Sequence, residues 1–243
     1  MDPASAAADY RANGYVVLPG ALSPDQLAGL RAAVETLLAE PPDDDGGGRY
    51  HDIGRGEARR FLRHRHADLP AVAAFLFGDT VRALARALIG PTPYLFNEQF
   101  VVKGAGAGAS FAWHQDGGYV GFAHRPYLTL WIALDDATEA NGCVYVLPRN
   151  LDADPGIAPH AWDATGKEMV GYDGPDEGVA LTCPAGTIVA FSSTTLHRSG
   201  ENRTQQRRRA YVCQFTPEPL LDPATGKPRS FAKPLVPDAP VPA

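Results

Sequence analysis

A histidine and an aspartate lie two residues apart in the segment Trp113-His114-Gln115-Asp116. In an extended strand, side chains two residues apart point to the same side, so this segment would present an imidazole and a carboxylate on one face. Two histidines and one carboxylate form a facial triad that binds Fe(II) and leaves coordination positions open. A single His-x-Asp pair is weak support for a metal site, because such pairs are common on solvated surfaces.

His197 is the best candidate for the third ligand. It follows the strand-like run 185–191 and the segment Ser192-Ser193-Thr194-Thr195-Leu196, so we expect it at a strand end or at the start of the next strand. His51, His124 and His160 have no partner at ligand spacing. The sequence therefore predicts an iron site made of His114, Asp116 and His197.

Arg208 stands eleven residues after His197 and begins another strand-like run, 208–215. A guanidinium group can hold a carboxylate through two parallel hydrogen bonds, which is what a dicarboxylate co-substrate beside a ferrous ion requires. Arg208 and Arg209 point to opposite faces of a strand. Strand parity alone therefore leaves open which of the two faces the site.

Helices and strands that could position these residues follow from hydrophobic periodicity and turn residues. Ser23-Pro24-Asp25-Gln26 forms a capping box, and apolar residues at three- and four-residue steps predict a helix from Pro24 to Glu40. A second helical pattern runs from Pro70 to Ile89. The stretch 43–60 lacks periodicity and is interpreted as a long loop, with a closing lid over 41–66 as the alternative. Short alternating or β-branched runs predict strands at 14–18, 94–103, 127–134, 143–147, 186–191 and 208–215.

Composition restricts the class of protein. The chain has 243 residues, 44% of them hydrophobic and 21% charged, which is typical of a globular protein. A net charge of −6 disfavours a nucleic-acid partner, and no apolar stretch is long enough for a membrane span. The N-terminus lacks the features of a signal peptide, and the three cysteines read as buried, reduced thiols. We therefore expect a cytoplasmic protein with a helical layer packed on a β-sandwich or barrel.

Several of these stretches together resemble the phytanoyl-CoA dioxygenase (PhyH) family of Fe(II)/2-oxoglutarate-dependent oxygenases. The resemblance extends from Tyr10 to Phe215 and rests on segments 14–20, 103–116, 130–148 and 197–208. It implies a mainly β fold with N-terminal helices, a double-stranded β-helix (a cupin-like jelly roll). The whole chain, 1–243, would be a single oxygenase domain. Its parts would be a helical layer and lid region (1–90), the jelly-roll core (91–216) and a loosely packed, Pro-rich tail (217–243).

The resemblance also implies functions for the residues above. His114, Asp116 and His197 would bind Fe(II), and Arg208 rather than Arg209 would clamp 2-oxoglutarate. With O2, such an enzyme converts 2-oxoglutarate to succinate and CO2 and oxidises a C–H bond of a small-molecule substrate. An intact Asp116 favours hydroxylation, or desaturation, cyclisation or epoxidation, because related halogenases replace this carboxylate with a small residue. The alternative is a cupin-like metal-binding or isomerase barrel without oxygenase turnover.

Polar residues on predicted strands are candidates for the wall of the co-substrate site. Gln99 and Lys103 share one face of the run 95–103 with Asn97, so we place the first two near 2-oxoglutarate and Asn97 nearer the substrate. The alternative is an edge strand with a solvated polar face. Thr129 and Trp131 share a face of the next strand, and the family resemblance places Trp131 and Ser199 near the co-substrate. Simple core packing is an equal alternative for Trp131.

The family resemblance also implies substrate contacts just after the His-x-Asp segment and in the insert before His197. Four residues are candidates for these contacts: Tyr119, Phe122, Arg125 and Trp162. The run Arg63-His64-Arg65-His66 could contact an anionic substrate, but a solvated cationic turn is the favoured interpretation. The acidic net charge mildly disfavours a highly anionic substrate. The sequence assigns neither the substrate nor the oligomeric state.

Overall fold

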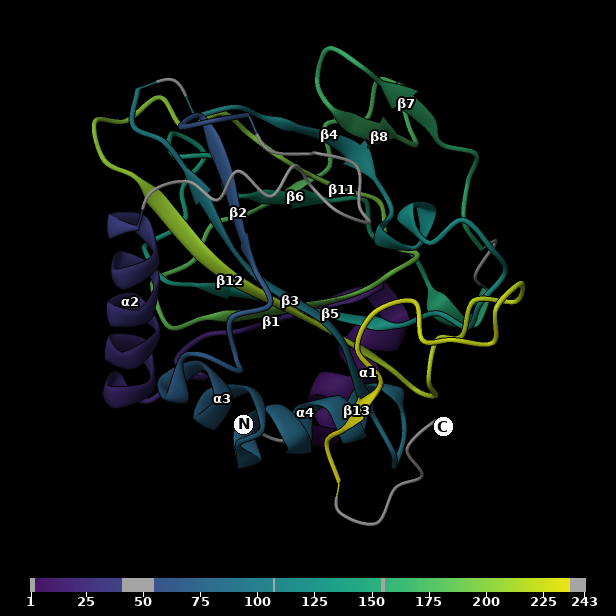
Figure 1. The fold of residues 1–243 in the computed structure, drawn as a ribbon. Helices are drawn as coiled ribbons and strands as arrows, with labels where there is room; N and C mark the ends of the chain where they lie inside the picture. Colours follow the sequence, from purple (N-terminus) through teal and green to yellow (C-terminus); the bar gives the residue numbers. More distant parts are fainter. Residues whose placement is uncertain (1–2, 41–54, 107, 154–155, 237–243) are drawn as a thin grey trace.

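Two antiparallel β-sheets face each other in the computed structural model, which describes residues 3–40, 55–106, 108–153 and 156–236 (Figure 1). The larger sheet has the strand order β1-β10-β5-β12-β3-β13, and β2 pairs with β3 beside β13. The smaller sheet has the order β4-β11-β6-β9. A jelly roll of this kind places the inner faces of both sheets around a common interior.

The element bounds are as follows. The helices are α1 (Pro3–Asn13), α2 (Pro24–Ala39), α3 (Pro70–Leu76) and α4 (Asp79–Ile89), with short 3₁₀ helices at Asp116–Tyr119 (η1) and Leu151–Ala153 (η2). The larger sheet contains β1 (Tyr15–Leu18), β2 (Arg59–Arg63), β3 (Tyr94–Lys103), β5 (Leu128–Ala133), β10 (Ile188–Ser192), β12 (Arg208–Thr216) and β13 (Lys233–Pro234). The smaller sheet contains β4 (Phe111–His114), β6 (Val144–Val146), β9 (Val179–Leu181) and β11 (His197–Ser199), and β7 (Ala161–Asp163) pairs with β8 (Glu168–Val170).

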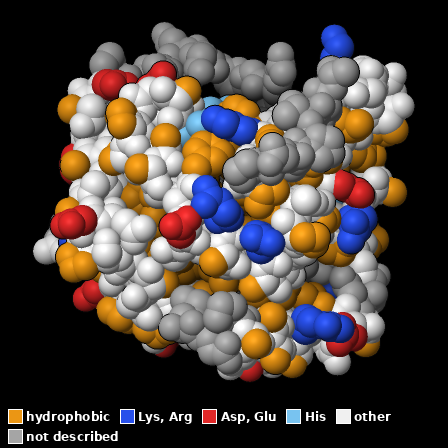
Figure 2. Space-filling view, turned by 90° about the horizontal axis from the view of Figure 1, so that it is seen from below, with side chains coloured by type: hydrophobic (Ala, Val, Ile, Leu, Met, Phe, Trp, Pro, Cys, Tyr) orange, Lys and Arg blue, Asp and Glu red, His pale blue; other side chains and the backbone are white. Residues whose placement is uncertain are grey.

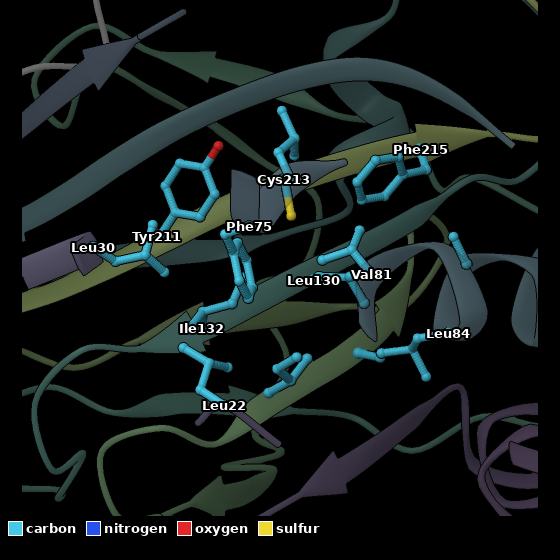
Figure 3. Packing of buried hydrophobic residues seen from close by; sticks show 14 of the residues in the cluster. Leu22, Leu30, Phe75, Val81, Leu84, Leu130, Ile132, Tyr211, Cys213 and Phe215 are labelled. Atoms are coloured by element: carbon cyan, nitrogen blue, oxygen red, sulfur yellow. The ribbon is translucent and has the colours of Figure 1, made fainter. Parts of the chain in front are cut away.

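The helices cover the outer face of the larger sheet (Figure 1). The capping box of α2 is formed, since the Ser23 side chain accepts from the Gln26 amide and the Gln26 side chain accepts from the Ser23 amide. Leu30, Phe75 and Val81 of the helices pack with strand residues in one apolar cluster (Figure 3). The helical layer therefore fixes the larger sheet from outside and leaves its inner face free to line an interior.

Phe75 illustrates how much this layer contributes. Its ring is almost fully buried and meets the Tyr211 ring edge-on, with centroids 6.1 Å apart. We expect Phe75→Ala to lower the free energy of unfolding by about 3–5 kcal/mol, because the cavity left in a packed core adds to the lost transfer energy. Urea denaturation would measure this. Leu221→Ala, at an exposed position, should change the free energy of unfolding by less than about 0.5 kcal/mol.

The sequence predicted α2, a helical run that Gly78 divides into α3 and α4, and the six strands, each to within two residues of its observed ends. It missed α1, whose Ala-rich sequence has little apolar periodicity, and it missed β2 in the stretch interpreted as a loop. The tail is better packed than expected within residues 217–236, because β13 pairs with β3 and Leu235 is buried. The lid expected over 41–66 lies largely outside the described residues, which resume at Arg55.

The three cysteines lie in the interior, as the sequence predicted. Cys143, Cys183 and Cys213 are buried and free, and burial raises the pKa of each thiol. Lys and Arg side chains lie among Asp, Glu and hydrophobic side chains on the face seen from below in Figure 2. No helix within the described ranges is long and apolar enough to cross a membrane.

Candidate metal centre

His114 and His197 are cross-strand neighbours, because β4 and β11 pair with these two residues in register. The Oδ1 atom of Asp116 lies 3.7 Å from Nε2 of His114 and 3.6 Å from Nε2 of His197. The expected placement of Asp116 on a strand is wrong: β4 ends at His114, and Asp116 begins η1. Gln115 between them keeps an extended backbone, so the two side chains still converge.

The rings of both histidines are oriented by main-chain carbonyls. Nδ1 of His114 bonds to the carbonyl of Ala112 at 2.8 Å, and Nδ1 of His197 bonds to that of Thr195 at 3.0 Å. A carbonyl can only accept, so Nδ1 carries the proton and Nε2 keeps its lone pair for a metal. Burial, and then the neighbouring His197, holds the pKa of His114 well below its usual range. The neutral imidazole that metal binding requires is therefore the favoured form of His114.

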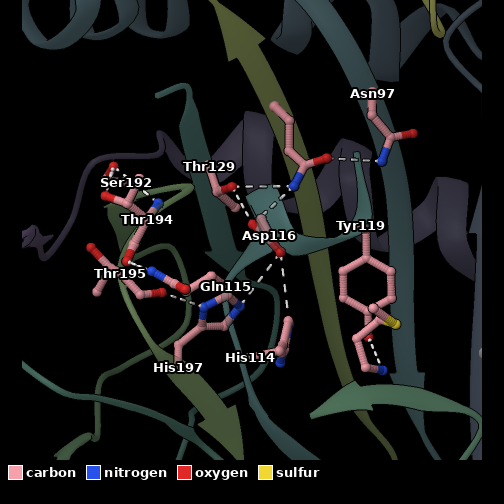
Figure 4. A network of polar contacts seen from close by, with 12 residues as sticks. Asn97, His114, Gln115, Asp116, Tyr119, Thr129, Ser192, Thr194, Thr195 and His197 are labelled. Carbon is pink, nitrogen blue, oxygen red and sulfur yellow. Dashed lines mark hydrogen bonds and ion pairs between the residues drawn. The ribbon is translucent and has the colours of Figure 1, made fainter. Parts of the chain in front are cut away.

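Side-chain hydrogen bonds to Oδ2 hold the Asp116 carboxylate in its orientation. Oδ2 accepts hydrogen bonds from the Thr129 hydroxyl and from Nε2 of Gln214, the latter at 2.9 Å, so Oδ1 is the oxygen that faces the two histidines (Figure 4). Oε1 of Gln214 accepts from Nδ2 of Asn97 at 3.0 Å, and Oδ1 of Asn97 bonds to Nε2 of His64 at 3.0 Å. A chain of side chains therefore fixes the carboxylate from behind.

The segment between the ligands is also anchored. The Gln115 amide donates to Nε2 of His160 at 2.9 Å, and the Gln115 side chain accepts from the Ala158 amide at 2.7 Å. Nε2 of the Gln115 side chain also donates to the carbonyl of Thr194, which directly precedes Thr195, the residue whose carbonyl orients His197. His160 does not belong to the group of three possible metal ligands. Through its bond to Gln115 it instead positions the backbone that carries His114 and Asp116.

The donor set fits a divalent metal. Two Nε2 atoms and one carboxylate oxygen lie within 4.8 Å of one another, and no other group of three His, Cys, Asp or Glu in the described part of the chain meets this criterion. Two imidazoles and one carboxylate on one side leave positions open for exogenous ligands, which suits Fe(II).

Gln214 should affect the metal without touching it. We expect Gln214→Leu to weaken Mn(II) binding, a stand-in for Fe(II), by about 10–100-fold, because outer contacts to a ligand typically contribute this much. Calorimetric titration of the apo-protein with Mn(II) would measure the change in affinity. Gln205→Leu, at an exposed position on the preceding loop, should bind Mn(II) as the wild type does. Equal affinities in both variants would show that the hydrogen bond to Asp116 has no such effect.

The triad opens into a cavity of about 540 Å³ between the two sheets. Arg208 lines it, is almost fully buried, and donates through Nη2 to the Gly142 carbonyl at 3.1 Å. Its Nε and Nη1 atoms are buried and make no hydrogen bond to any described residue. Burial lowers the pKa of Arg208 to about 10, so the group remains a cation at neutral pH.

Lys103 lies beside Arg208 in the cavity. The two residues are paired across β3 and β12, and the Lys103 ammonium donates to the Gly200 carbonyl. Burial, with the Arg208 charge adding to it, lowers the pKa of Lys103 to about 6. A buried guanidinium with two unused nitrogens and a neighbouring amine, which donate to the carbonyls of Gly142 and Gly200, fit the distal carboxylate of a dicarboxylate.

Arg209 faces the opposite side, as strand parity requires. It forms ion pairs with Asp135 at 2.5 Å and with Glu35 of α2 at 2.7 Å. Arg208 is therefore the arginine of this pair that lines the cavity. Strand parity left open whether Arg208 or Arg209 faces the site, and the family resemblance favoured Arg208. The structure places Arg208 at the cavity.

Most of the remaining predicted site residues line the same cavity, and three do not. The cavity-lining ones are Asn97, Gln99, Thr129, Trp131, Ser199 and Tyr119. Phe122 instead packs against an apolar cluster that includes Val120. Arg125 forms an exposed ion pair with Glu218, and Trp162 is exposed on β7. The insert that carries Trp162 therefore does not bring that side chain to the site.

Sequence reasoning missed the contribution of β2. Arg59, Phe61 and Arg63 of this strand line the cavity, and Arg59 forms a buried ion pair with Glu168 at 2.9 Å. The alternation Arg-x-Phe-x-Arg was a possible signal, but it stands next to a stretch without periodicity. The interpretation of Arg63 as part of a solvated turn is wrong, because it belongs to a strand and faces the interior.

Comparisons with known proteins agree with this geometry. A model of the family described as phytanoyl-CoA dioxygenase (PhyH) matches residues 10–210. An L-proline trans-4-hydroxylase of Streptomyces griseoviridis is 29% identical over 82% of this chain and 81% of its own. A methylphosphonate hydroxylase of Gimesia maris is 30% identical over 85% of this chain and 77% of its own. The crystal structure of EvdO2 from Micromonospora carbonacea var. aurantiaca complexed with 2-oxoglutarate has a TM-score of 0.72 and 26% identity, covering 94% of this chain and 96% of that one.

Proposed function

The chain belongs to the phytanoyl-CoA dioxygenase family, and from that premise we propose that it is an Fe(II)- and 2-oxoglutarate-dependent dioxygenase that hydroxylates a C–H bond of a small molecule. The reaction would consume O2 and convert 2-oxoglutarate to succinate and CO2. The relatives named above include hydroxylases of L-proline and of methylphosphonate, which supports hydroxylation of a small substrate.

One observation carries the proposal: a buried arginine with two unused guanidinium nitrogens lines the cavity that holds the facial triad. A barrel that only binds a metal has no use for such a cation, since leaving it buried and unpaired costs free energy. A co-substrate with a carboxylate at each end would bind the metal with one end and Arg208 with the other. The pairing of triad and arginine therefore favours an oxygenase over a metal-binding barrel.

The residues of the chain would divide the work between them. His114, Asp116 and His197 would hold the iron, which when bound supplies the redox chemistry that couples 2-oxoglutarate decarboxylation to substrate oxidation. Arg208 would orient the co-substrate, and the indole of Trp131, 5.4 Å below the Arg208 guanidinium carbon, would keep that end dry. Phe191, whose ring lies 4.4 Å from that of His197, would exclude water beside the metal.

An anaerobic titration tests the proposal. Fe(II) is added to the apo-protein, followed by 2-oxoglutarate, and a visible charge-transfer band is followed. The band should form only when both are present, and O2 added afterwards should release succinate in amounts that match the loss of 2-oxoglutarate. Iron binding without any 2-oxoglutarate-dependent band would instead identify a metal-binding barrel and refute the oxygenase function.

Binding of 2-oxoglutarate should take up a proton through Lys103. With a pKa of about 6, the amine is mostly neutral at pH 7.5 in the free protein, and a carboxylate placed beside it favours the charged form and raises its pKa. The affinity for 2-oxoglutarate should therefore rise as pH falls from 8 toward 6 and level off below 6. Calorimetry at pH 7.5 in buffers of different ionisation enthalpy should report uptake that approaches one proton.

The control separates this amine from other titrating groups. Lys103→Met should remove the buffer dependence of the binding enthalpy, while Lys233→Met, a change at an exposed lysine of β13, should leave it intact. A wild-type enthalpy independent of the buffer would show that Lys103 does not change its protonation state when 2-oxoglutarate binds.

A further inference from the structure

His64 lies at the far end of the hydrogen-bond chain that begins at Asp116. The sequence favours a solvated cationic turn for the run 63–66, which contains it. In the structure His64 is half-buried, and Nε2 of its ring lies 3.0 Å from Oδ1 of Asn97. Two side chains, those of Asn97 and Gln214, therefore connect this imidazole to a metal ligand.

The backbone of His64 shows how its ring reaches Asn97. Arg63 and the residues two and four before it line the cavity, so strand alternation would turn His64 toward the opposite face of the sheet. The His64 amide still continues the ladder, because it donates to the Glu98 carbonyl at 3.1 Å. Its φ of 61° lies in the left-handed region, which costs free energy for a residue with a side chain. This conformation ends β2 and brings the ring to Asn97, which lines the cavity.

The C-terminal segment holds the same ring from another side. The Phe231 ring meets the His64 ring edge-on, with centroids 4.7 Å apart. The Phe231 amide donates to the Phe96 carbonyl of β3 at 3.1 Å, which fixes Phe231 to the sheet. The end of β2 and the C-terminal segment thus both determine where the His64 ring lies.

The direction of each hydrogen bond in this chain follows from Asp116. An ionised carboxylate can only accept, so Gln214 donates to it through Nε2 at 2.9 Å and keeps Oε1 as an acceptor. Oε1 accepts from Nδ2 of Asn97 at 3.0 Å, which leaves Oδ1 of Asn97 to face His64. Since this oxygen can only accept, Nε2 of His64 must carry a proton. We call the four residues His64, Asn97, Gln214 and Asp116 the relay.

The relay requires His64 to differ from the metal-binding histidines in its tautomer. His114 and His197 carry their protons on Nδ1, because these atoms bond to main-chain carbonyls. Burial lowers the pKa of His64, so its neutral ring, with a proton on one nitrogen, predominates at pH 7.5. In the relay that nitrogen is Nε2. The other neutral tautomer would place a nitrogen lone pair against the Asn97 oxygen.

We propose that His64 is a positioning residue for the iron ligand Asp116, and that its Nε2–H fixes the carboxylate through Asn97 and Gln214. With the relay intact, both amides are held in one orientation, Oδ2 of Asp116 accepts from Gln214, and Oδ1 faces the two histidines (Figure 4). Without the His64 donor, Asn97 loses the partner that distinguishes its oxygen from its nitrogen. The inference rests on the proposed function, since the relay ends at a ligand of the proposed iron site.

Long-range ¹H–¹⁵N NMR of the metal-free wild-type protein at pH 7.5 tests the position of the proton directly. The His64 ring should show the Nε2–H tautomer, whereas the rings of His114 and His197 should show the Nδ1–H tautomer. An Nδ1–H tautomer at His64 would overturn the inference, whatever the variants do. Because this measurement needs neither metal nor turnover, its outcome is independent of the proposed function.

Calorimetric titration with Mn(II), a stand-in for Fe(II), tests the effect on the metal site. His64→Leu should weaken Mn(II) binding by about three- to tenfold, less than Gln214→Leu, because two side chains separate His64 from the ligand. His64→Gln, whose amide can donate in place of Nε2, should bind Mn(II) within about twofold of the wild-type affinity. His124→Leu, a change outside the cavity lining, should bind as the wild type does. A wild-type protein that binds no Mn(II) would refute the proposed function, and the His64 tautomer would still test the relay.

Two further proteins separate positioning from a structural role. His64→Gly adopts the left-handed backbone without strain but has no donor, so it should lose as much Mn(II) affinity as His64→Leu. In a Gln214→Leu background, His64→Leu should change the affinity by less than about twofold, because the relay is already broken. Circular dichroism checks that each variant is folded. Wild-type affinity in folded His64→Leu or His64→Gly, or an equal loss from His64→Leu in both backgrounds, would overturn the inference.

Discussion

Replacing His197 with alanine should abolish iron binding at micromolar Fe(II) and, with it, the 2-oxoglutarate-dependent band. His197 supplies one of three protein donors, and its Nε2 lies 3.6 Å from the Asp116 oxygen that completes the site. Since outer contacts to metal ligands already contribute 10–100-fold in affinity, loss of the ligand itself should cost more than about 100-fold. Anaerobic Fe(II) titration, followed by calorimetry and by the visible band, would measure both effects.

A second histidine provides the control for this variant. His124 lies outside the cavity lining and bonds through Nδ1 to the Phe122 carbonyl. His124→Ala should retain Fe(II) affinity and the band. Circular dichroism of both variants separates loss of the metal from loss of the fold. Unchanged Fe(II) affinity in a folded His197→Ala protein would contradict the assignment of the triad.

Replacing Arg208 with alanine should weaken 2-oxoglutarate binding by about 100-fold or more and leave Fe(II) affinity unchanged. The guanidinium has two nitrogens free for a carboxylate, and each hydrogen bond to a charged group contributes about 1.5–3 kcal/mol. The strength of the charge-transfer band as a function of 2-oxoglutarate concentration reports this affinity directly. Arg208→Lys should recover only part of it, because an ammonium keeps the charge but cannot form two parallel bonds.

The exposed neighbour Arg207 is the matched control for the loss of a cation. Arg207→Ala changes the net charge by the same amount as Arg208→Ala but should bind 2-oxoglutarate with wild-type affinity. If the two variants lose affinity equally, long-range electrostatics rather than a specific clamp would account for the effect of Arg208.

Local patterns were sufficient for much of the fold. The Ser23–Gln26 capping box and the apolar face that follows specify α2, because both signals are local to the helix. Alternation along 95–103 placed Asn97, Gln99 and Lys103 on one face of β3, and all three line the cavity. Period-two alternation predicts this reliably when one face of a strand lines an interior.

Long-range contacts account for what the sequence did not reveal. Arg63 belongs to a strand through the pairing of β2 with β3, in which its partner Gln99 stands 36 positions later in the chain. Gln214 contacts Asp116 across the barrel, although the two are 98 positions apart in the chain. The placements of Phe122 and Trp162 depend on how loops fold over the barrel, which spacing alone does not determine.

The three buried thiols make the two layers of this protein separately observable. Cys213 belongs to the apolar cluster between the helices and the larger sheet, whereas Cys143 and Cys183 belong to the cluster inside the barrel. A protonated, buried thiol reacts with an alkylating reagent only when its surroundings open. Labelling kinetics at each cysteine, measured by mass spectrometry, therefore report how fast the structure opens on either side of the larger sheet, with no probe engineered into the chain.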